Sequence, residues 1–157
     1  MTSPETAPAF DLEDFLPYRL SVVTNRVSRA FASRYEAAWG LSIPEWRVLA
    51  VVGAFAPLSA AAVCERTAMD KVKVSRAVAR LVRRGLLTRR RDAGDHRVRL
   101  LALGDEGRRV YAGIVPLALA IDAALTGALS QRQRSGLLQA LDKLDACVAD
   151  LDDTPPA

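Results

Sequence analysis

Apolar residues recur at steps of three and four over most of the chain, and this spacing predicts a mainly α-helical protein. Glycine is common just beyond a helix, so a first helix is expected from about Tyr18 to Trp39, before Gly40. Its apolar stripe consists of Leu16, Leu20, Val23, Val27, Phe31 and Tyr35. A capping box of Ser130 and Gln133 precedes a last helix. The apolar seam of that helix consists of Leu137, Leu138, Leu141, Leu144, Val148 and Leu151.

Three shorter helices are predicted between these two from their capping residues. Ser42 and Glu45 have the S-x-x-E spacing of a capping box, in which each side chain accepts a backbone hydrogen bond. Ser59 is expected to cap a short third helix. Asp70 is expected to cap a fourth helix, which ends at Gly85. The side chains expected to point inward from the helix after Ser42 are Trp46, Leu49, Val52 and Phe55.

The period of the pattern changes after the fourth helix. Residues 86–91 and 98–103 are short runs separated by a turn-rich segment, 92–97, which predicts a β-hairpin with a long loop. A long helix is expected from Asp105, with a bend at Pro116. The predicted order is therefore four helices, two strands and two helices.

Opposite faces of the predicted fourth helix differ in charge. At about 100° per residue, one face carries Val74, Val78, Leu81 and Val82. The opposite face carries Lys73, Arg76, Arg80, Arg83 and Arg84. Like charges four residues apart repel one another, so such a face indicates a polyanionic partner. With the short helix before it, this helix predicts a helix-turn-helix. The hairpin behind it forms a basic wing with Arg89, Arg90, Arg91, Arg97 and Arg99.

The charge distribution is uneven along the chain. The 157 residues have a formal net charge of +4. The stretch from Arg66 to Arg109 holds 14 basic and 5 acidic residues, which leaves 8 basic and 13 acidic residues elsewhere. A basic centre between acidic ends is typical of a module that binds a polyanion. A solvated charged face would have the same local charge, so the position of the charges on the helix and hairpin favours nucleic acid.

Several other classes of protein are not indicated. The longest uncharged run, Val48–Cys64, has 17 residues and contains Gly53 and Pro57, so no segment is expected to span a membrane. No membrane partner is expected either, and the protein is expected to be cytoplasmic. No catalytic triad, phosphate loop or carboxylate pair is present, which predicts that the protein is not an enzyme. With His96 as the one histidine, neither a metal nor a cofactor is expected. Cys64 is expected to pack as a small apolar residue, and the pattern does not settle whether it or Cys147 is redox-active.

Three segments resemble the MarR family of winged-helix transcriptional regulators. They are LSIPEWRVLAVV from Leu41, MDKVKVSRAVARLVRRGLL from Met69 and RRRDAGDHRVRLLALGDEG from Arg89. The most specific part of the resemblance is the pair Asp95-x-Arg97, together with the strand after it and the start of the next helix. The order of the helices extends the resemblance to about 140 residues. The sequence differs from the family pattern at His96, where Arg or Lys is commoner, and at Gly104, which replaces a Thr or Ser cap.

The resemblance implies a homodimer with intertwined terminal helices, two lobes on a palindromic operator and, often, a small effector. The fold expected is mainly α with a small β-hairpin wing, as a winged helix-turn-helix lobe plus a dimerisation region of N- and C-terminal helices. The expected divisions are a flexible tail (1–10), an N-terminal dimerisation helix (11–41), the DNA-binding domain (42–104), C-terminal dimerisation helices (105–151) and a second tail (152–157).

DNA contacts are expected from the recognition helix and the wing. In the helix, Lys73 and Arg76 are expected to reach guanine edges, and Ser75 or Lys71 to hold phosphate. The whole helix set is Lys71, Val72, Lys73, Ser75, Arg76 and Arg80. The wing set is Arg89, Arg91, Asp95, His96 and Arg97, with the Asp95 carboxylate expected to orient the Arg97 guanidinium for a narrow A·T-rich groove. A surface ion pair without a role in binding is the alternative for that pair.

Aromatic side chains and cations indicate a pocket for a phenolic carboxylate, although helix packing would also explain the aromatics. This candidate effector pocket consists of Tyr18, Arg19, Trp39, Trp46 and Arg47. The predicted function is a homodimeric, sequence-specific DNA-binding regulator, acting as a repressor that a small aromatic or phenolic effector releases. The alternative is a helical dimeric protein-interaction module whose basic strip binds an acidic partner. The effector, the operator, the regulated genes and the choice between repressor and activator stay open.

Overall fold

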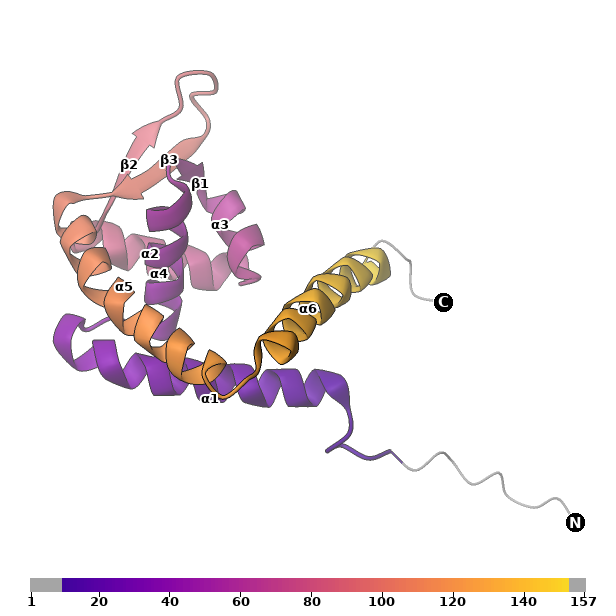
Figure 1. Cartoon of the computed structure of the whole chain (residues 1–157). Helices are drawn as coiled ribbons and strands as arrows, with labels where there is room; N and C mark the ends of the chain where they lie inside the picture. Colours follow the sequence, from indigo (N-terminus) through magenta and orange to yellow (C-terminus); the bar gives the residue numbers. More distant parts are fainter. Residues whose placement is uncertain (1–9, 153–157) are drawn as a thin grey trace, which may run out of the picture. The chain divides into compact units, whose positions relative to one another are not determined.

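The computed structural model describes residues 10–152 and contains six helices and three strands in this range (Figure 1). Helix α1 (Leu16–Trp39) has Pro17 in its first turn, where proline is tolerated because the first backbone N–H groups lack helical partners. It ends at Gly40, which has the left-handed φ of 58° expected of a glycine at this position. The helix therefore begins two residues before the expected start at about Tyr18, at the first residue of its apolar stripe, and its end is as predicted.

Side-chain caps start the three helices that follow. In front of α2 (Ile43–Phe55), the Ser42 Oγ accepts from the Glu45 backbone N–H at 3.4 Å, and a Glu45 carboxylate oxygen accepts from the Ser42 backbone N–H at 2.8 Å. The capping box is therefore confirmed. Ser59 caps α3 (Ala60–Thr67), and Asp70 caps α4 (Lys71–Arg83), both as predicted.

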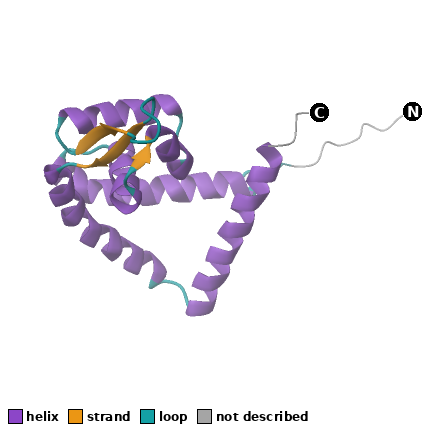
Figure 2. Cartoon of the chain, turned by 90° about the horizontal axis from the view of Figure 1, so that it is seen from above, coloured by secondary structure: helices purple, strands orange, loops and turns teal. Residues whose placement is uncertain are grey.

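A three-stranded antiparallel sheet lies in the otherwise helical lobe, where its strands are orange in Figure 2. Strand β2 (Leu87–Arg91) pairs with β3 (Arg99–Leu103), which confirms the predicted hairpin. The third strand, β1 (Leu58–Ser59), pairs with the other edge of β3. The two-strand prediction was therefore incomplete, because a strand of two residues shows no alternation of apolar and polar positions.

The core of the lobe is formed where α2, α4 and the sheet meet. Its largest fully buried side chains are those of Tyr35, Leu41, Leu49, Leu81, Leu86, Leu87, Leu101 and Ile114. Phe55 was expected to join them, and this prediction was wrong because the ring is 52% exposed. Phe55 is the last residue of α2, and its ring lies at the surface under the Arg66 guanidinium, 4.1 Å from the guanidinium carbon to the ring centroid.

Helix α5 (Asp105–Thr126) starts in close contact with the turn between α4 and the hairpin. A Cβ atom on Gly107 would collide with the Leu86 carbonyl oxygen, and one on Gly104 with the Gly85 carbonyl oxygen. The Gly104 backbone N–H donates to the Leu86 carbonyl oxygen at 2.9 Å. This close approach explains why glycine stands at position 104, where the family commonly has a hydroxyl cap.

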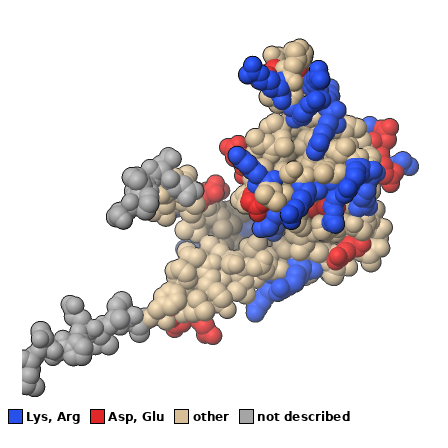
Figure 3. Space-filling view, turned by 180° about the vertical axis from the view of Figure 1, so that it is seen from behind, with Lys and Arg blue, Asp and Glu red and all other residues tan. Residues whose placement is uncertain are grey.

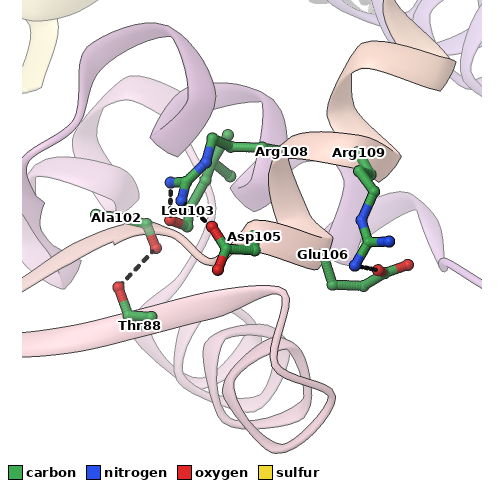
Figure 4. A network of polar contacts seen from close by, with 7 residues as sticks. All are labelled: Thr88, Ala102, Leu103, Asp105, Glu106, Arg108 and Arg109. Atoms are coloured by element: carbon green, nitrogen blue, oxygen red, sulfur yellow. Dashed lines mark hydrogen bonds and ion pairs between the residues drawn. The ribbon is translucent and has the colours of Figure 1, made fainter.

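Polar contacts fix the base of the hairpin to the first turn of α5 (Figure 4). Arg108 donates to the Leu103 carbonyl oxygen at 2.8 Å and pairs with Asp105. On the hairpin itself, the Thr88 hydroxyl donates to the Ala102 carbonyl oxygen at 3.4 Å. These contacts hold the end of β3 on the helix that follows it.

The chain consists of two compact units, and the boundary between them lies within α5. The first unit ends at Val115 and the second begins at Pro116. The second unit contains the end of α5 and α6 (Gln131–Asp152). The predicted capping box is confirmed here, since the Ser130 backbone N–H donates to Gln133 at 2.9 Å and the Gln133 backbone N–H donates to the Ser130 Oγ at 3.3 Å. Of the predicted tails, residues 1–9 and 153–157 lie outside the described range.

Within residues 10–152, α5 is the one helix long and apolar enough to cross a membrane by length and composition. Gly107, Val110 and Ile114 on this helix are buried in the first unit. A single helix of this kind is weak evidence for a membrane span, and the first half of α5 contributes these three residues to the core of the first unit.

Candidate nucleic-acid interface

Helix α4 separates a buried face from a charged face. Val74, Ala77, Val78 and Leu81 are at most 3% exposed. The opposite face is exposed and includes all the recognition-helix residues predicted to contact DNA, which are Lys71, Val72, Lys73, Ser75, Arg76 and Arg80. The division of the helix into a core face and a basic face is therefore confirmed.

Lys73 differs from the other cations of this face because it has an acidic partner. Its Nζ atom lies 3.2 Å from an oxygen of Asp70, which also caps the helix by accepting from the Lys73 backbone N–H at 2.8 Å. That backbone hydrogen bond, and then the Lys73 ammonium, hold the pKa of Asp70 below its usual range. Among residues 10–152, no hydrogen bond or ion pair occupies the side chains of Arg76, Arg80 and Arg83.

Arg84 was predicted to be one of five outward cations, and it is exposed but also bonds to α1. Its guanidinium donates to the carbonyl oxygens of Trp39 at 2.6 Å and of Gly40 at 3.0 Å. The last carbonyl groups of a helix lack helical partners and carry partial negative charge, so a guanidinium stabilises them. Arg84 therefore joins the end of α4 to the end of α1.

A hollow of about 510 Å³ lies between the start of α2 and the outer face of α4. Its cationic lining consists of Lys73, Arg76, Arg80 and Arg83, and the α2 side contributes Ser42, Pro44 and Glu45. Glu45 is only 5% exposed and accepts hydrogen bonds from the backbone N–H and the hydroxyl of Ser42. The acidic side chain is therefore buried and hydrogen-bonded, while the arginines are exposed.

The register of the hairpin places most of the wing arginines on one face. Arg89 pairs with Leu101 and Arg91 pairs with Arg99, so these four side chains share a face of the sheet. Leu101 is buried, which shows that this is the face turned toward the core. Arg90 points to the opposite face, and it lines a hollow with Arg108 and others at the base of the wing.

The tip of the wing is shaped by backbone hydrogen bonds to aspartate side chains. The Asp95 carboxylate accepts from the Arg97 backbone N–H at 2.9 Å, and the Asp92 carboxylate accepts from the Gly94 backbone N–H at 3.3 Å. The Asp92 N–H donates to the Val98 carbonyl oxygen at 3.1 Å and closes the loop. The carboxylate of Asp95 was expected to hold the guanidinium of Arg97, and this was wrong. It holds the backbone instead, as aspartates in turns commonly do.

Basic side chains gather on one side of the first unit, on the wing and on the lobe beneath it (Figure 3). Figure 3 shows Lys and Arg gathered over the projecting wing and in a band across the lobe beneath it. The wing residues predicted to contact DNA are all exposed, and they are Arg89, Arg91, Asp95, His96 and Arg97. Two separate basic elements of secondary structure therefore contribute to one surface.

The residues predicted to form an effector pocket do not all lie together. Tyr18 and Arg19 are in the first turn of α1, whereas Trp39 ends that helix, about 31 Å farther along its axis at 1.5 Å per residue. Trp46 packs against the rings of Phe31, Tyr35 and Tyr111, with centroids 5.6–6.3 Å apart. Arg47 donates to the Ser28 hydroxyl of α1 at 3.0 Å. Tyr18 and Arg19 therefore lie far from Trp39, whereas Trp46 and Arg47 both lie next to Tyr35.

Tyr35 lies at the centre of this aromatic cluster and is 1% exposed. Burial, and to a smaller extent the charge of Glu36, raise the pKa of Tyr35 to about 12, although the Arg47 guanidinium acts in the opposite direction. The phenol is therefore neutral at physiological pH, and the cluster contributes to the core.

Two features of this surface were not predicted from the sequence: the contact of Arg84 with α1 and the pairing of Lys73 with Asp70. Each depends on where a side chain turns after folding. The i, i+3 spacing of Asp70 and Lys73 was the one available signal, since residues at this spacing are neighbours on a helix.

A helix-turn-helix with an exposed basic second helix, followed by a basic antiparallel hairpin, defines a winged-helix DNA-binding protein. A sequence model described as the MarR family matches residues 39–98. The transcriptional regulator HosA of Escherichia coli O127:H6 is 26% identical over 121 residues, which cover 74% of this chain and 90% of HosA.

Solved structures are similar over most of the chain. The MarR family transcriptional regulator SPO1453 from Silicibacter pomeroyi is 30% identical with a TM-score of 0.73, over 87% of this chain and 98% of that one. BpsR from Bordetella bronchiseptica is 24% identical with a TM-score of 0.76, over 87% of this chain and 97% of that one. Its structure is described as showing how 6-hydroxynicotinic acid regulates the DNA binding of BpsR. The chain belongs to the MarR family of DNA-binding transcriptional regulators.

Proposed function

We propose that the protein is a homodimeric repressor that binds a palindromic operator and is released by a small aromatic or phenolic effector. The observation that carries the proposal is the set of three exposed arginines on α4, Arg76, Arg80 and Arg83, which have no partner among residues 10–152. Repulsion between such neighbours destabilises a surface helix unless an anion neutralises them. A DNA duplex supplies regularly spaced phosphates and base acceptors for these groups.

The wing supports DNA over an acidic protein as the partner. Arg89, Arg91 and Arg99 share one face of the hairpin, and Arg97 is at its exposed tip. We assign α4 to a major groove and the wing to the adjacent minor groove, where a narrow A·T-rich groove attracts arginine. Lys71 or Ser75 is assigned to phosphate, and Arg76 to a guanine edge.

Dimerisation is proposed from apolar side chains near both ends of the described chain. On α1, Leu16, Leu20 and Val23 are 39–58% exposed. On α6, the exposed apolar side chains are those of Leu137, Leu138, Leu141, Val148 and Leu151. Pairing these faces across a two-fold axis would remove them from water and place two recognition helices about one DNA turn, roughly 34 Å, apart. Residues 11–41 and 105–151 are accordingly assigned to dimerisation, and 42–104 to DNA binding.

The effector part of the proposal rests on Arg47 and Trp46. The Arg47 guanidinium is a half-buried cation beside aromatic rings, which suits a phenolic or heteroaromatic carboxylate. BpsR, which shares the fold, is described as regulated by such a compound, 6-hydroxynicotinic acid. Tyr18 and Arg19 lie at the other end of α1 and are left out of this subsite.

Selection of bound fragments from genomic DNA tests the function, followed by titration of the selected duplex at several salt concentrations. A regulator of this kind enriches a palindrome, and the logarithm of its affinity falls steeply with the logarithm of salt concentration as counterions are released. Sedimentation at micromolar concentration should give a dimer, and 6-hydroxynicotinic acid serves as the first effector probe. A folded monomer contradicts the dimer, and the absence of duplex binding at low salt favours an acidic protein partner instead.

A further inference from the structure

Val72 is an apolar residue in the most basic part of the surface. It is the second residue of α4, it is 57% exposed, and its neighbours in sequence are Lys71 and Lys73. The buried positions of the helix begin only at Val74, so the Val72 side chain adds little to the core. Polar residues would be expected at an exposed helix start, where the first backbone N–H groups face solvent. The valine side chain is therefore free to contact a partner.

Arg76 is the neighbour of Val72 on the outer face. The two residues are four positions apart, so they lie next to each other along one side of α4. In residues 10–152, the guanidinium of Arg76 is unpaired, whereas the ammonium of Lys73 lies 3.2 Å from Asp70 at the flank of the helix. The first turns of α4 thus present two methyl groups beside a guanidinium that can donate two parallel hydrogen bonds.

These two chemistries match two different bases in the major groove. Thymine alone carries a methyl group on its groove edge, and guanine presents two acceptors to an arginine. We infer that Val72 packs against the C5-methyl group of a thymine in each half-site, beside the guanine that Arg76 reads, an inference that rests on the proposed function. One helical turn rises about 5.4 Å and one base pair about 3.4 Å, so the thymine lies within about two base pairs of the guanine.

Replacement of thymine by deoxyuridine tests this directly, because the exchange removes only the methyl group. The probe is the duplex selected by the wild-type protein, with each symmetry-related pair of thymines replaced in turn. At one pair, affinity should fall about fourfold for each half-site, the effect of burying one methyl group. Val72→Ala should bind the thymine and deoxyuridine duplexes at that pair equally well. Replacements at the other thymines serve as matched controls that leave both proteins unaffected.

A second base exchange tests the same contact by adding a methyl group instead of removing one. Where the thymine is changed to cytosine, 5-methylcytosine should bind the wild-type protein about fourfold more tightly than cytosine for each half-site. If no thymine exchange changes affinity while 7-deazaguanine still lowers it, the Val72 contact is refuted and the DNA-binding function stands. A selection that enriches no sequence refutes sequence-specific binding, and this inference with it.

Discussion

The guanidinium of Arg84 lies 2.6 Å from the carbonyl oxygen of Trp39 and joins the end of the recognition helix to the end of α1. The Trp39 ring is held from another side, because a Cβ atom on Gly113 of α5 would be only 2.8 Å from it. The C-terminus of α1 is therefore fixed by both α4 and α5. A movement of α1 at this end would disturb the Arg84 contact with the recognition helix.

Arg84→Ala should lower the free energy of unfolding by about 1 kcal/mol, because two carbonyl groups lose a charged donor. The exposed neighbour Arg83 is the matched control, since it has the same charge and no partner among residues 10–152. Arg83→Ala should leave stability unchanged or slightly raised, since one repulsive charge is removed, and should weaken DNA binding. Urea unfolding and duplex titration of both variants measure the two effects. Equal losses of stability would show that the Arg84 contacts contribute nothing.

The wing tip offers a test that separates backbone shape from charge. Asp95→Asn keeps an oxygen that can accept from the Arg97 backbone N–H and removes the negative charge. We expect Asp95→Asn to bind the operator like the wild type, and Asp95→Ala to bind it more weakly because the loop loses its turn. Affinity titrations of the two variants decide the matter. If the asparagine variant fails as the alanine variant does, the carboxylate charge is what matters.

Arg97→Ala should weaken operator binding strongly and leave thermal stability and dimerisation nearly unchanged. The reason is that the Arg97 guanidinium is exposed and has no partner in the described chain. Operator titration, thermal unfolding and sedimentation provide the three measurements. Binding equal to that of the wild type would remove the wing tip from the interface.

Arg76→Ala should cost about 1–3 kcal/mol of binding free energy at the selected operator and relax its base preference. The loss of affinity for a nonspecific duplex should be smaller, because Arg76 makes only part of this base contact there. The comparison of the two duplexes at one salt concentration is the measurement. Equal losses would identify Arg76 as a phosphate contact.

Gly107→Ala should destabilise the protein by about 1–3 kcal/mol, because the added methyl group collides with the Leu86 carbonyl oxygen of the backbone. Gly136→Ala is the matched control in another helix, where no atom lies within 4 Å of the added group. That variant should be neutral or up to about 1 kcal/mol more stable, since alanine favours helix. Denaturant unfolding compares them, and an unaffected Gly107→Ala protein would contradict the close packing of α5.

Tyr35 should be the source of a late step in an alkaline titration. Its pKa is raised to about 12 in the folded protein, whereas a tyrosine in an unfolded chain has a pKa of about 10. The folded state therefore holds this proton more tightly, and the stability it contributes is complete below about pH 10 and lost as the pH rises toward 12. Near-ultraviolet absorbance follows the tyrosinate, and Tyr35→Phe should lack the late step. If the Tyr35→Phe variant keeps the late step, that step comes from another group.

The helices could be predicted because their signals are local. Ser42, Ser59, Asp70 and Ser130 each cap a helix through an atom three residues away, a spacing that is visible in the sequence. The two faces of α4 follow from helical periodicity for the same reason. The strand β1 has only two residues and is defined by its partner across the sheet, so no local pattern reveals it.

Contacts between distant residues could not be predicted in this way. The Arg84 side chain binds carbonyl groups 44 and 45 residues away, and a backbone carbonyl has no signature in the sequence. Asp95 and Arg97 were correctly seen as a pair, but two residues at this spacing can meet through a guanidinium or through a backbone N–H. Phe55 has the right spacing to face inward, yet its helix ends there and the ring remains at the surface.

The alternation of side chains along β2 has a consequence for how the wing can change in evolution. Arg89 and Arg91 share a face only because one residue separates them, and the pairing with β3 fixes which face that is. An insertion between the two arginines would reverse one of them, since each added residue changes the side on which later side chains emerge. An insertion in the loop of residues 92–98 would leave both strands in register. Natural variation in the length of the wing should therefore be concentrated at its tip, while the spacing of the strand arginines stays constant.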